Sequence, residues 1–275
     1  MTSASDDGRW AIVLVDADIN PGDYYLFDTV NRKAQFLRAA RTWIEPKQMR
    51  PKQPISLAAR DGLQLHGYVT RPAGDGAHPM VVLPHDGPWG ERDTWEFDWE
   101  VQLLASRGYA VLQVNYRGSD GYGLAFERAG DREWGGRIQD DITDATRWAI
   151  AQGFARADRI CIYGTGYGGY AALMGVARER DLYRCAIGYG GLYDLSSEVG
   201  LRQLSRSQRL RMERVLGAEV ARLRSLSPVN NARAISAPVL LIHGRKDWNV
   251  GYDQAERMRR ALARERKPVE LVTLS

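Results

Sequence analysis

Short apolar runs separated by amphipathic segments dominate the chain from residue 55 onward. Several runs are almost continuously apolar, which is typical of parallel strands buried on both faces of a sheet. They cover residues 80–83, 110–114, 160–163, 186–188, 239–242 and 269–274. Between them, apolar residues recur at steps of three and four, as on one face of a helix. Strands that alternate with helices predict a doubly wound, mostly parallel α/β sheet.

Two of the helical segments assign residues to the core. The apolar stripe of the first consists of Ile138, Ile142, Ala145 and Ala149, and that of the second of Ala255, Met258 and Leu262. The polar positions of the first segment that we expect to face away from the core are Asp140, Asp141 and Asp144. Both helices are therefore predicted to pack their apolar stripe on the sheet.

The first 50 residues follow a different pattern. Their short apolar runs cover residues 10–15, 24–27 and 34–37. Such runs predict a β-meander, which with three strands is an incomplete all-β unit. A connector with three prolines leads to an expected hairpin around Asp61-Gly62. We therefore expect a small β unit with its linker at residues 1–50 and an α/β domain at residues 51–275.

Composition and charge narrow the class of protein. Hydrophobic residues make up 44% and charged residues 26% of the 275 residues, which fits a globular protein with one large domain. The net charge of +4 is small, and the arginine-rich stretches at 202–224 and 257–267 have helical spacing, so they predict solvated helix faces. No signal-peptide pattern occurs, and no apolar run approaches the roughly 20 residues of a membrane span. We expect neither nucleic acid nor membrane as a partner, and a cytoplasmic location.

The chain has two cysteines, Cys161 and Cys185, and both lie in apolar runs that are expected to be strands. Cysteines in such positions are typically buried thiols that behave as small apolar residues. We expect both to be free, which implies no oxidising compartment.

A glycine-rich turn at residues 163–170 (YGTGYGGY) joins an expected strand to a helical run of small residues. Two chemistries use such a turn. A nucleophile elbow, G-x-S-x-G, holds a serine above the end of a sheet. A dinucleotide fingerprint, G-x-G-x-x-G, lets a pyrophosphate approach a helix N-terminus. The glycines fit the second pattern as they stand, and the first only if Gly166 replaces the serine.

Dinucleotide binding fits the rest of the chain poorly. That fold places the fingerprint in its first βα unit and an acidic residue about 20 residues later. Here at least two parallel-type strands precede the turn, and the next strand ends in GYGG at 188–191 without a carboxylate. We therefore expect no cofactor, with dinucleotide binding as a remote alternative.

A hydrolase elbow requires three partners from other parts of the chain. An earlier strand should end in a loop that offers an N–H to an oxyanion, and residues 84–90 (PHDGPWG) follow the strand expected at 80–83. A carboxylate should follow a later strand, as Asp247 follows the run at 239–242. A histidine should come after that carboxylate, yet His66, His78, His85 and His243 all precede it.

Further motifs accompany these loops. They are HDGP at 85–88, NYRGS at 115–119, GYG at 121–123, WGG at 134–136, DD at 140–141, and LIHG at 241–244 with Asp247 and Val250. Together with the glycine-rich turn they resemble the prolyl oligopeptidase family of serine peptidases, especially its acylaminoacyl-peptidase and bacterial dipeptidyl-aminopeptidase branch. The resemblance covers most of residues 52–274. It implies an α/β-hydrolase fold that cleaves peptide or acyl-peptide bonds, and it makes residues 1–50 the last strands of a β-propeller.

The sequence departs from that family in its residues and at its ends. The family has serine where this chain has Gly166, and it usually has glycine where this chain has Asp86. The family's catalytic histidine and last helix would follow Ser275, and most of its propeller would precede Met1. By this resemblance the chain is a fragment without its nucleophile, and we expect it to be inactive as written.

The resemblance also implies roles at the site. Position 166 is that of the nucleophile, and Asp247 is that of the acid that orients the histidine. The backbone N–H groups of Tyr167 and Gly87 match the oxyanion hole, and His85 replaces a tyrosine that points at the oxyanion in more distant relatives. Ordinary loop or turn geometry would also explain each of these residues. No pair of histidines has the spacing of metal ligands, so we expect no metal.

Two alternatives stay open at this point. The motifs are compatible with a non-catalytic α/β-hydrolase-fold protein that binds a ligand or partner where the family has its active site, and with esterase activity on small acyl substrates.

A separate expectation concerns residues 269–274, whose apolar side chains lie on both faces of the last strand. Without the family's last helix one face would stay uncovered, which favours self-association.

Overall fold

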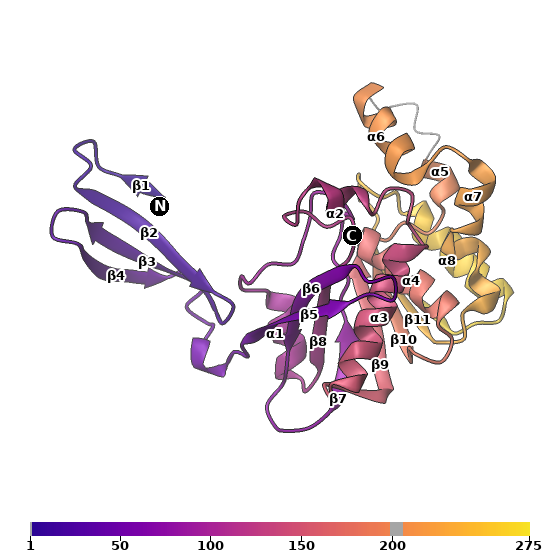
Figure 1. Cartoon of the computed structure of the whole chain (residues 1–275), viewed down its shortest axis with the longest axis horizontal. Helices are drawn as coiled ribbons and strands as arrows, with labels where there is room; N and C mark the ends of the chain where they lie inside the picture. The colour runs from indigo at the N-terminus through magenta and orange to yellow at the C-terminus, as the bar shows by residue number, and fades with distance from the viewer. Residues whose placement is uncertain (1, 199–205) are drawn as a thin grey trace.

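In the computed structural model, which describes residues 2–198 and 206–275, the main body is built on one eight-stranded sheet (Figure 1). Its strands are β5 (Lys52–Ala58), β6 (Gln64–Thr70), β7 (His78–Val82), β8 (Ala110–Asn115), β9 (Ala155–Thr165), β10 (Cys185–Tyr189), β11 (Val239–Gly244) and β12 (Val269–Leu274). In the order β12-β11-β10-β9-β7-β8-β6-β5, strands β7 to β12 run parallel, whereas β6 and β5 form an antiparallel hairpin at one edge. The predicted mostly parallel α/β fold and the hairpin around Asp61-Gly62 are confirmed.

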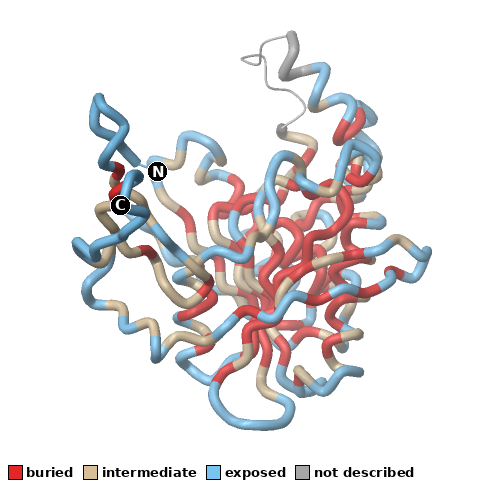
Figure 2. The backbone as a smooth tube through the Cα atoms, turned by 60° about the vertical axis from the view of Figure 1, so that its left-hand side comes forward, coloured by how far each residue is buried: buried red, intermediate tan, exposed pale blue. Residues whose placement is uncertain are grey.

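Helices cover both faces of this sheet. The described helices are α1 (Trp99–Ser106), α2 (Leu124–Arg128), α3 (Arg137–Ala151), α4 (Tyr167–Arg178), α5 (Leu195–Glu198), α6 (Arg206–Leu216), α7 (Val220–Ser225) and α8 (Asp253–Arg264), with 3₁₀ turns at Pro46–Gln48, Pro228–Asn230 and Ala232–Ala234. Helices α3, α4 and α8 pack on one face and enclose the main core, which forms the buried centre in Figure 2. Helix α1 packs on the other face, where Val101 meets Leu83 and Val111. None of the described helices is long and apolar enough to cross a membrane.

Asp141 corrects one expectation for helix α3. The apolar stripes predicted for α3 and α8 are fully buried, and Asp140 and Asp144 lie nearer the surface, paired with Arg60. Asp141 is also fully buried, and its carboxylate accepts hydrogen bonds from Nη2 and Nε of Arg117 at 2.6 and 2.8 Å. Burial raises the pKa of the Asp141 carboxyl, and the hydrogen bonds from Arg117 oppose that rise. The expectation that Asp141 faces away from the core is wrong, because the loop after β8 supplies a buried cation to pair with it.

The N-terminal segment forms its own antiparallel sheet, set apart from the main body in Figure 1. Its strands pair in the order β1 (Ser3–Ala4), β2 (Trp10–Ala17), β3 (Asn20–Asp28) and β4 (Lys33–Ala39). The predicted meander is confirmed, with the short β1 as a strand that the pattern did not indicate. Asp18 ties this sheet to the main body: its carboxylate accepts the Lys52 N–H at 2.7 Å and its carbonyl accepts Gln102 Nε2 at 3.1 Å. Four antiparallel strands fit the expected propeller remnant, while the boundary at residue 50 stays a prediction.

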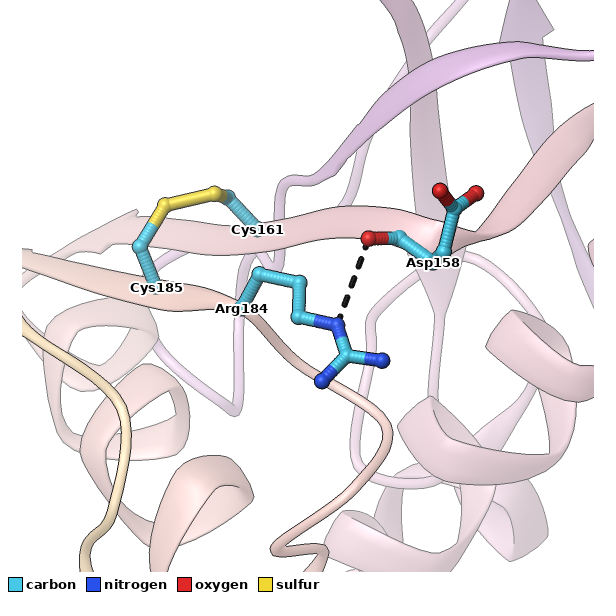
Figure 3. Close-up of a disulfide and its surroundings, with 4 residues drawn as sticks. All are labelled: Asp158, Cys161, Arg184 and Cys185. Atoms are coloured by element: carbon cyan, nitrogen blue, oxygen red, sulfur yellow. Dashed lines mark hydrogen bonds between the residues drawn. A yellow bond between two sulfur atoms is a disulfide. The ribbon is translucent and has the colours of Figure 1, made fainter.

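Cys161 and Cys185 are joined by a disulfide, so the expectation of two free thiols is wrong (Figure 3). The parallel pairing of β9 with β10 places the two residues opposite each other, with 4.7 Å between their Cα atoms. That separation lies within the reach of a disulfide. Both residues are half-buried rather than buried. Because disulfides persist in oxidising environments, the cysteines no longer argue against such a compartment.

We expect the native chain to show no reactive thiol, and two thiols after reduction in denaturant. Loss of the bond should lower the free energy of unfolding by about 3 kcal/mol, because the bond constrains a loop with a sequence separation of 24 in the unfolded chain. Urea unfolding of the oxidised chain and of the double variant Cys161→Ala/Cys185→Ala measures the difference. A reducing agent should leave the double variant unchanged, and two reactive thiols in the native wild type would contradict the assignment.

Candidate active site

Gly166 occupies the sharp turn between strand β9 and helix α4. Its φ of 55° and ψ of −118° form a backbone conformation that L side chains rarely adopt. Two backbone hydrogen bonds hold the turn, from the Gly166 N–H to the Tyr189 carbonyl at 2.9 Å and from the Tyr170 N–H to the Gly166 carbonyl at 3.1 Å. Gly168 has no room for a side chain, because a Cβ there would strike the carbonyl oxygen of Pro84. These glycines therefore let the helix start directly behind the loop that follows β7.

Two backbone N–H groups converge beside this turn, those of Gly87 and Tyr167. Both donate to the same oxygen, Oδ1 of Asp86, at 2.8 and 2.6 Å respectively. Tyr167 is the first residue of α4, so its N–H has no partner within the helix. Two N–H groups aimed at one oxygen are the arrangement that stabilises an oxyanion. The structure thus brings together the pair of donors that the sequence indicated, with a carboxylate oxygen between them.

Asp86 is a residue of this site to which the sequence gave no role. The residue is exposed at the end of the sheet, while its carboxyl group lies against the turn. A Cβ built on Gly166 would lie 2.5 Å from Cγ of Asp86, far inside normal contact. The only signal in the sequence was that both positions depart from the family that it resembles.

Asp247 lies in the loop after β11, at the same edge of the sheet as Gly166. Its Oδ1 accepts the backbone N–H groups of Asn249 and Val250 at 2.9 and 3.0 Å, which fixes the carboxylate in the loop. Its Oδ2 faces Gly190, where a Cβ would lie 3.3 Å away. Gly190 directly follows β10, the strand that accepts the Gly166 N–H. Asp247 is therefore near the elbow, and its role as the orienting acid stays a prediction.

His85 is held within the loop that carries Gly87. Its Nδ1 lies 2.6 Å from the carbonyl oxygen of Asp86, its Nε2 lies 2.8 Å from Oγ of Ser119, and its ring stacks on Tyr116 at 4.2 Å. Desolvation lowers the pKa of the imidazole to about 4, and the hydrogen bond to Asp86 opposes this shift. Since both ring nitrogens have partners, these contacts favour anchoring of the loop, and a role of His85 at the oxyanion stays a prediction.

The chemistry available at the site is that of hydrogen bonding and charge. Among the side chains that the structure describes, those of residues 2–197 and 210–275, no cluster of three or more His, Cys, Asp or Glu could hold a metal ion. The turn offers no hydroxyl or thiol at position 166. A parallel sheet, a sharp strand-to-helix elbow and a convergent N–H pair at its carboxyl end define the class of α/β hydrolases.

Comparisons with known proteins identify the family. Residues 95–275 match the model of the prolyl oligopeptidase family. The chain is 35% identical over 286 residues to dipeptidyl aminopeptidase BIII of Pseudoxanthomonas mexicana, which covers 98% of this chain and 41% of that protein. It therefore belongs to the prolyl oligopeptidase family, and the family and its relatives are serine peptidases.

Solved structures agree in fold with this family. A puromycin-hydrolysing peptidase of Mycobacterium tuberculosis has a TM-score of 0.86 at 27% identity, covering 97% of this chain and 42% of that one. The acylaminoacyl peptidase of Pyrococcus horikoshii has a TM-score of 0.84 at 26% identity, covering 97% of this chain and 43% of that one. The chain thus spans about two fifths of the length of the relatives that it matches.

We expect the His85 imidazole to stay neutral down to about pH 4. The unfolded chain takes up this proton near pH 6.5, so between pH 6.5 and 4 it binds more protons than the folded chain. The contribution of His85 to the free energy of unfolding therefore falls as the pH falls from 6.5 to 4. The test compares urea unfolding of the wild type and His85→Gln from pH 7 to 4, with the wild type losing relatively more stability.

The wild type must be compared with His85→Gln because Asp93 titrates in the same pH window, and its contribution to stability changes with pH in the opposite direction. Burial raises the pKa of Asp93 to about 7, so its contribution falls as the pH rises. Nuclear magnetic resonance of the His85 ring provides the direct control. A ring that titrates near pH 6.5 would contradict the desolvated position in the loop.

Proposed function

We propose that this chain is the hydrolase domain of a serine peptidase that cleaves peptide or acyl-peptide bonds, with esters of small acyl groups as a further substrate class. The family match over residues 95–275 supports peptide-bond hydrolysis. The names of two relatives, a dipeptidyl aminopeptidase and an acylaminoacyl peptidase, support substrates that are cleaved close to an amino terminus. The N–H groups of Gly87 and Tyr167 would meet the charge that develops on the scissile carbonyl oxygen.

We further propose that the chain forms no acyl-enzyme as its sequence stands. The observation that carries this proposal is the absence of a side chain at Gly166, the position that the family resemblance assigns to the nucleophile. Covalent catalysis needs an attacking hydroxyl or thiol that is activated by a neighbouring base. Without it, only binding and the oxyanion donors remain, and loss of a triad nucleophile typically lowers kcat about 10⁶-fold.

A non-catalytic binding protein is the second candidate, and one observation favours it. The Asp86 carboxylate lies between the two oxyanion donors, where a substrate carbonyl oxygen would have to sit. A site arranged in this way can still bind a peptide through the residues around the two donors. Saturable binding of a peptide without turnover would favour this candidate over a peptidase.

A fluorophosphonate probe tests for covalent chemistry. We expect no mass increase on the intact 275-residue chain after incubation, because Gly166 offers no nucleophilic atom to the phosphorus. A family member with an intact serine, treated in parallel, should be labelled stoichiometrically and serves as the control. Stoichiometric labelling of this chain would overturn the proposal, and labelling that disappears in Thr165→Val would identify the neighbouring hydroxyl as a substitute nucleophile.

We also propose self-association through the sheet face formed by β10, β11 and β12. The apolar side chains of Val272 and Leu274 are 38% and 41% exposed there. A hollow of about 540 Å³ lies at the same three strands. Its lining residues are Cys185, Ala186, Ile187, Pro238, Val239, Leu240, Pro268, Val269 and Glu270. Exposed apolar surface of this kind favours association, and a second copy of the chain offers the same surface.

Light scattering of the chain should show a dimer or larger species that Val272→Lys converts to monomer, because a charge in the interface would be buried unpaired. Val30→Lys is the matched control, since Val30 is 71% exposed in the N-terminal sheet. A wild-type monomer at all concentrations would contradict the proposal.

The cytoplasmic location also stays a prediction, which the Cys161–Cys185 disulfide does not support.

A further inference from the structure

The Asp86 carboxylate has the contacts of a bound ligand although it belongs to the chain. Its Oδ1 accepts two backbone N–H bonds, from Gly87 at 2.8 Å and Tyr167 at 2.6 Å. Among the side chains of residues 2–197 and 210–275, no cation is paired with this carboxylate. The negative charge is thus held by backbone groups alone. Hydrogen bonds of N–H groups to an ionised carboxylate are short and roughly twice as strong as those between neutral groups.

Helix α4 adds to this attraction. Tyr167 is its first residue and the helix has 12 residues, so its N-terminal N–H groups carry the positive end of the helix dipole. An anion at that position is stabilised by the dipole and by the otherwise unpaired N–H. Asp86, in the loop after the neighbouring strand β7, supplies the anion near the positive end of the dipole and accepts the unpaired N–H. The two N–H donors therefore already have an anionic acceptor before any substrate arrives.

A side chain at position 166 would occupy the space that the side chain of Asp86 fills. A Cβ on residue 166 would lie 2.5 Å from Cγ and Oδ2 of Asp86, whereas unstrained carbon contacts are about 3.5 Å or longer. A side chain at 166 and the observed carboxylate therefore cannot both be present without movement. The absence of a side chain at Gly166 is what makes room for Asp86.

We propose that Asp86 is the built-in carboxylate ligand of the pocket formed by the Gly87 and Tyr167 N–H groups, and that Gly166 is the residue that admits it. The carboxylate excludes the carbonyl oxygen of an external acyl group from the two donors. Removal of the carboxylate opens a site for a small monocarboxylate, the chemical class of the product of acyl or peptide hydrolysis. This occupancy is independent of whether the whole protein cleaves peptides.

Acetate is the probe for the opened pocket. In Asp86→Ala of the full 275-residue chain, we expect acetate to shift the amide resonances of Gly87 and Tyr167 saturably, because the site is then free and positively polarised. Chloride at equal ionic strength controls for general salt effects. In the wild type and in Asp86→Asn, whose side-chain carbonyl can still accept both N–H bonds, the same amides should not respond.

An equal response of the wild type and Asp86→Ala would overturn the proposal, since the pocket would then not be occupied by Asp86. A folded Asp86→Ala that shows no response at either amide would also overturn it. Asp86→Gly has the same expected response and replaces the alanine variant if that variant does not fold.

A double-mutant cycle tests the shared volume without any ligand. Gly166→Ala is compared in the wild type and in the Asp86→Ala background by urea unfolding. The strain from the positive φ at residue 166 is present in both backgrounds and cancels. We expect Gly166→Ala to lower the folding equilibrium constant by a factor on the order of ten more in the wild type than in the Asp86→Ala background. Additive effects would show that Asp86 and residue 166 do not compete.

Discussion

Two backbone N–H groups that share one carboxylate oxygen are the interaction on which the arrangement of the site depends. The Gly87 N–H is placed by the loop after β7, and the Tyr167 N–H by the first turn of α4. Strands β7 and β9 are neighbours in the sheet and run parallel, so both loops leave from the same edge. An ion held by both loops therefore links two segments that are 80 residues apart in the chain.

The glycines around the elbow follow from this constraint. Gly166 has a backbone conformation that few other residues adopt, and it leaves the space that the carboxyl group of Asp86 fills. Gly168 allows the first turn of α4 to lie against the carbonyl of Pro84. The chain belongs to a family of serine peptidases, and a convergent pair of N–H donors is the arrangement that stabilises an oxyanion. In this chain, both N–H groups donate to the carboxylate of Asp86.

The fold could be predicted from the sequence because it depends on patterns that are local. Continuous apolar runs indicated the strands that are buried on both faces, and the spacing of Ile138 and Ile142 indicated the buried side of α3. The errors concern residues whose partners come from elsewhere. Asp141 is buried because Arg117 lies opposite it, and Cys161 is bonded because strand register places Cys185 beside it. Neither the ion pair nor the register is encoded in the spacing of apolar residues.

The candidate site could be predicted in part, for the same reason. Loop ends of parallel strands meet at one edge, and the resemblance to the family singled out Gly87, Tyr167 and Asp247 in the loops expected there. The contact of Asp86 with the two N–H groups depends on how the loop after β7 curves, which the sequence does not show. Two separate departures from a family pattern, at residues 86 and 166, prove to be neighbours in space.

The most direct test of the account is amide hydrogen exchange at Gly87 and Tyr167, followed by nuclear magnetic resonance in the wild type and in Asp86→Ala. If the Asp86 carboxylate accepts both N–H bonds, both amide protons exchange with water more slowly in the wild type than in Asp86→Ala, because the variant lacks their acceptor. Equal exchange rates of the two amides in the wild type and in a folded Asp86→Ala would contradict the account.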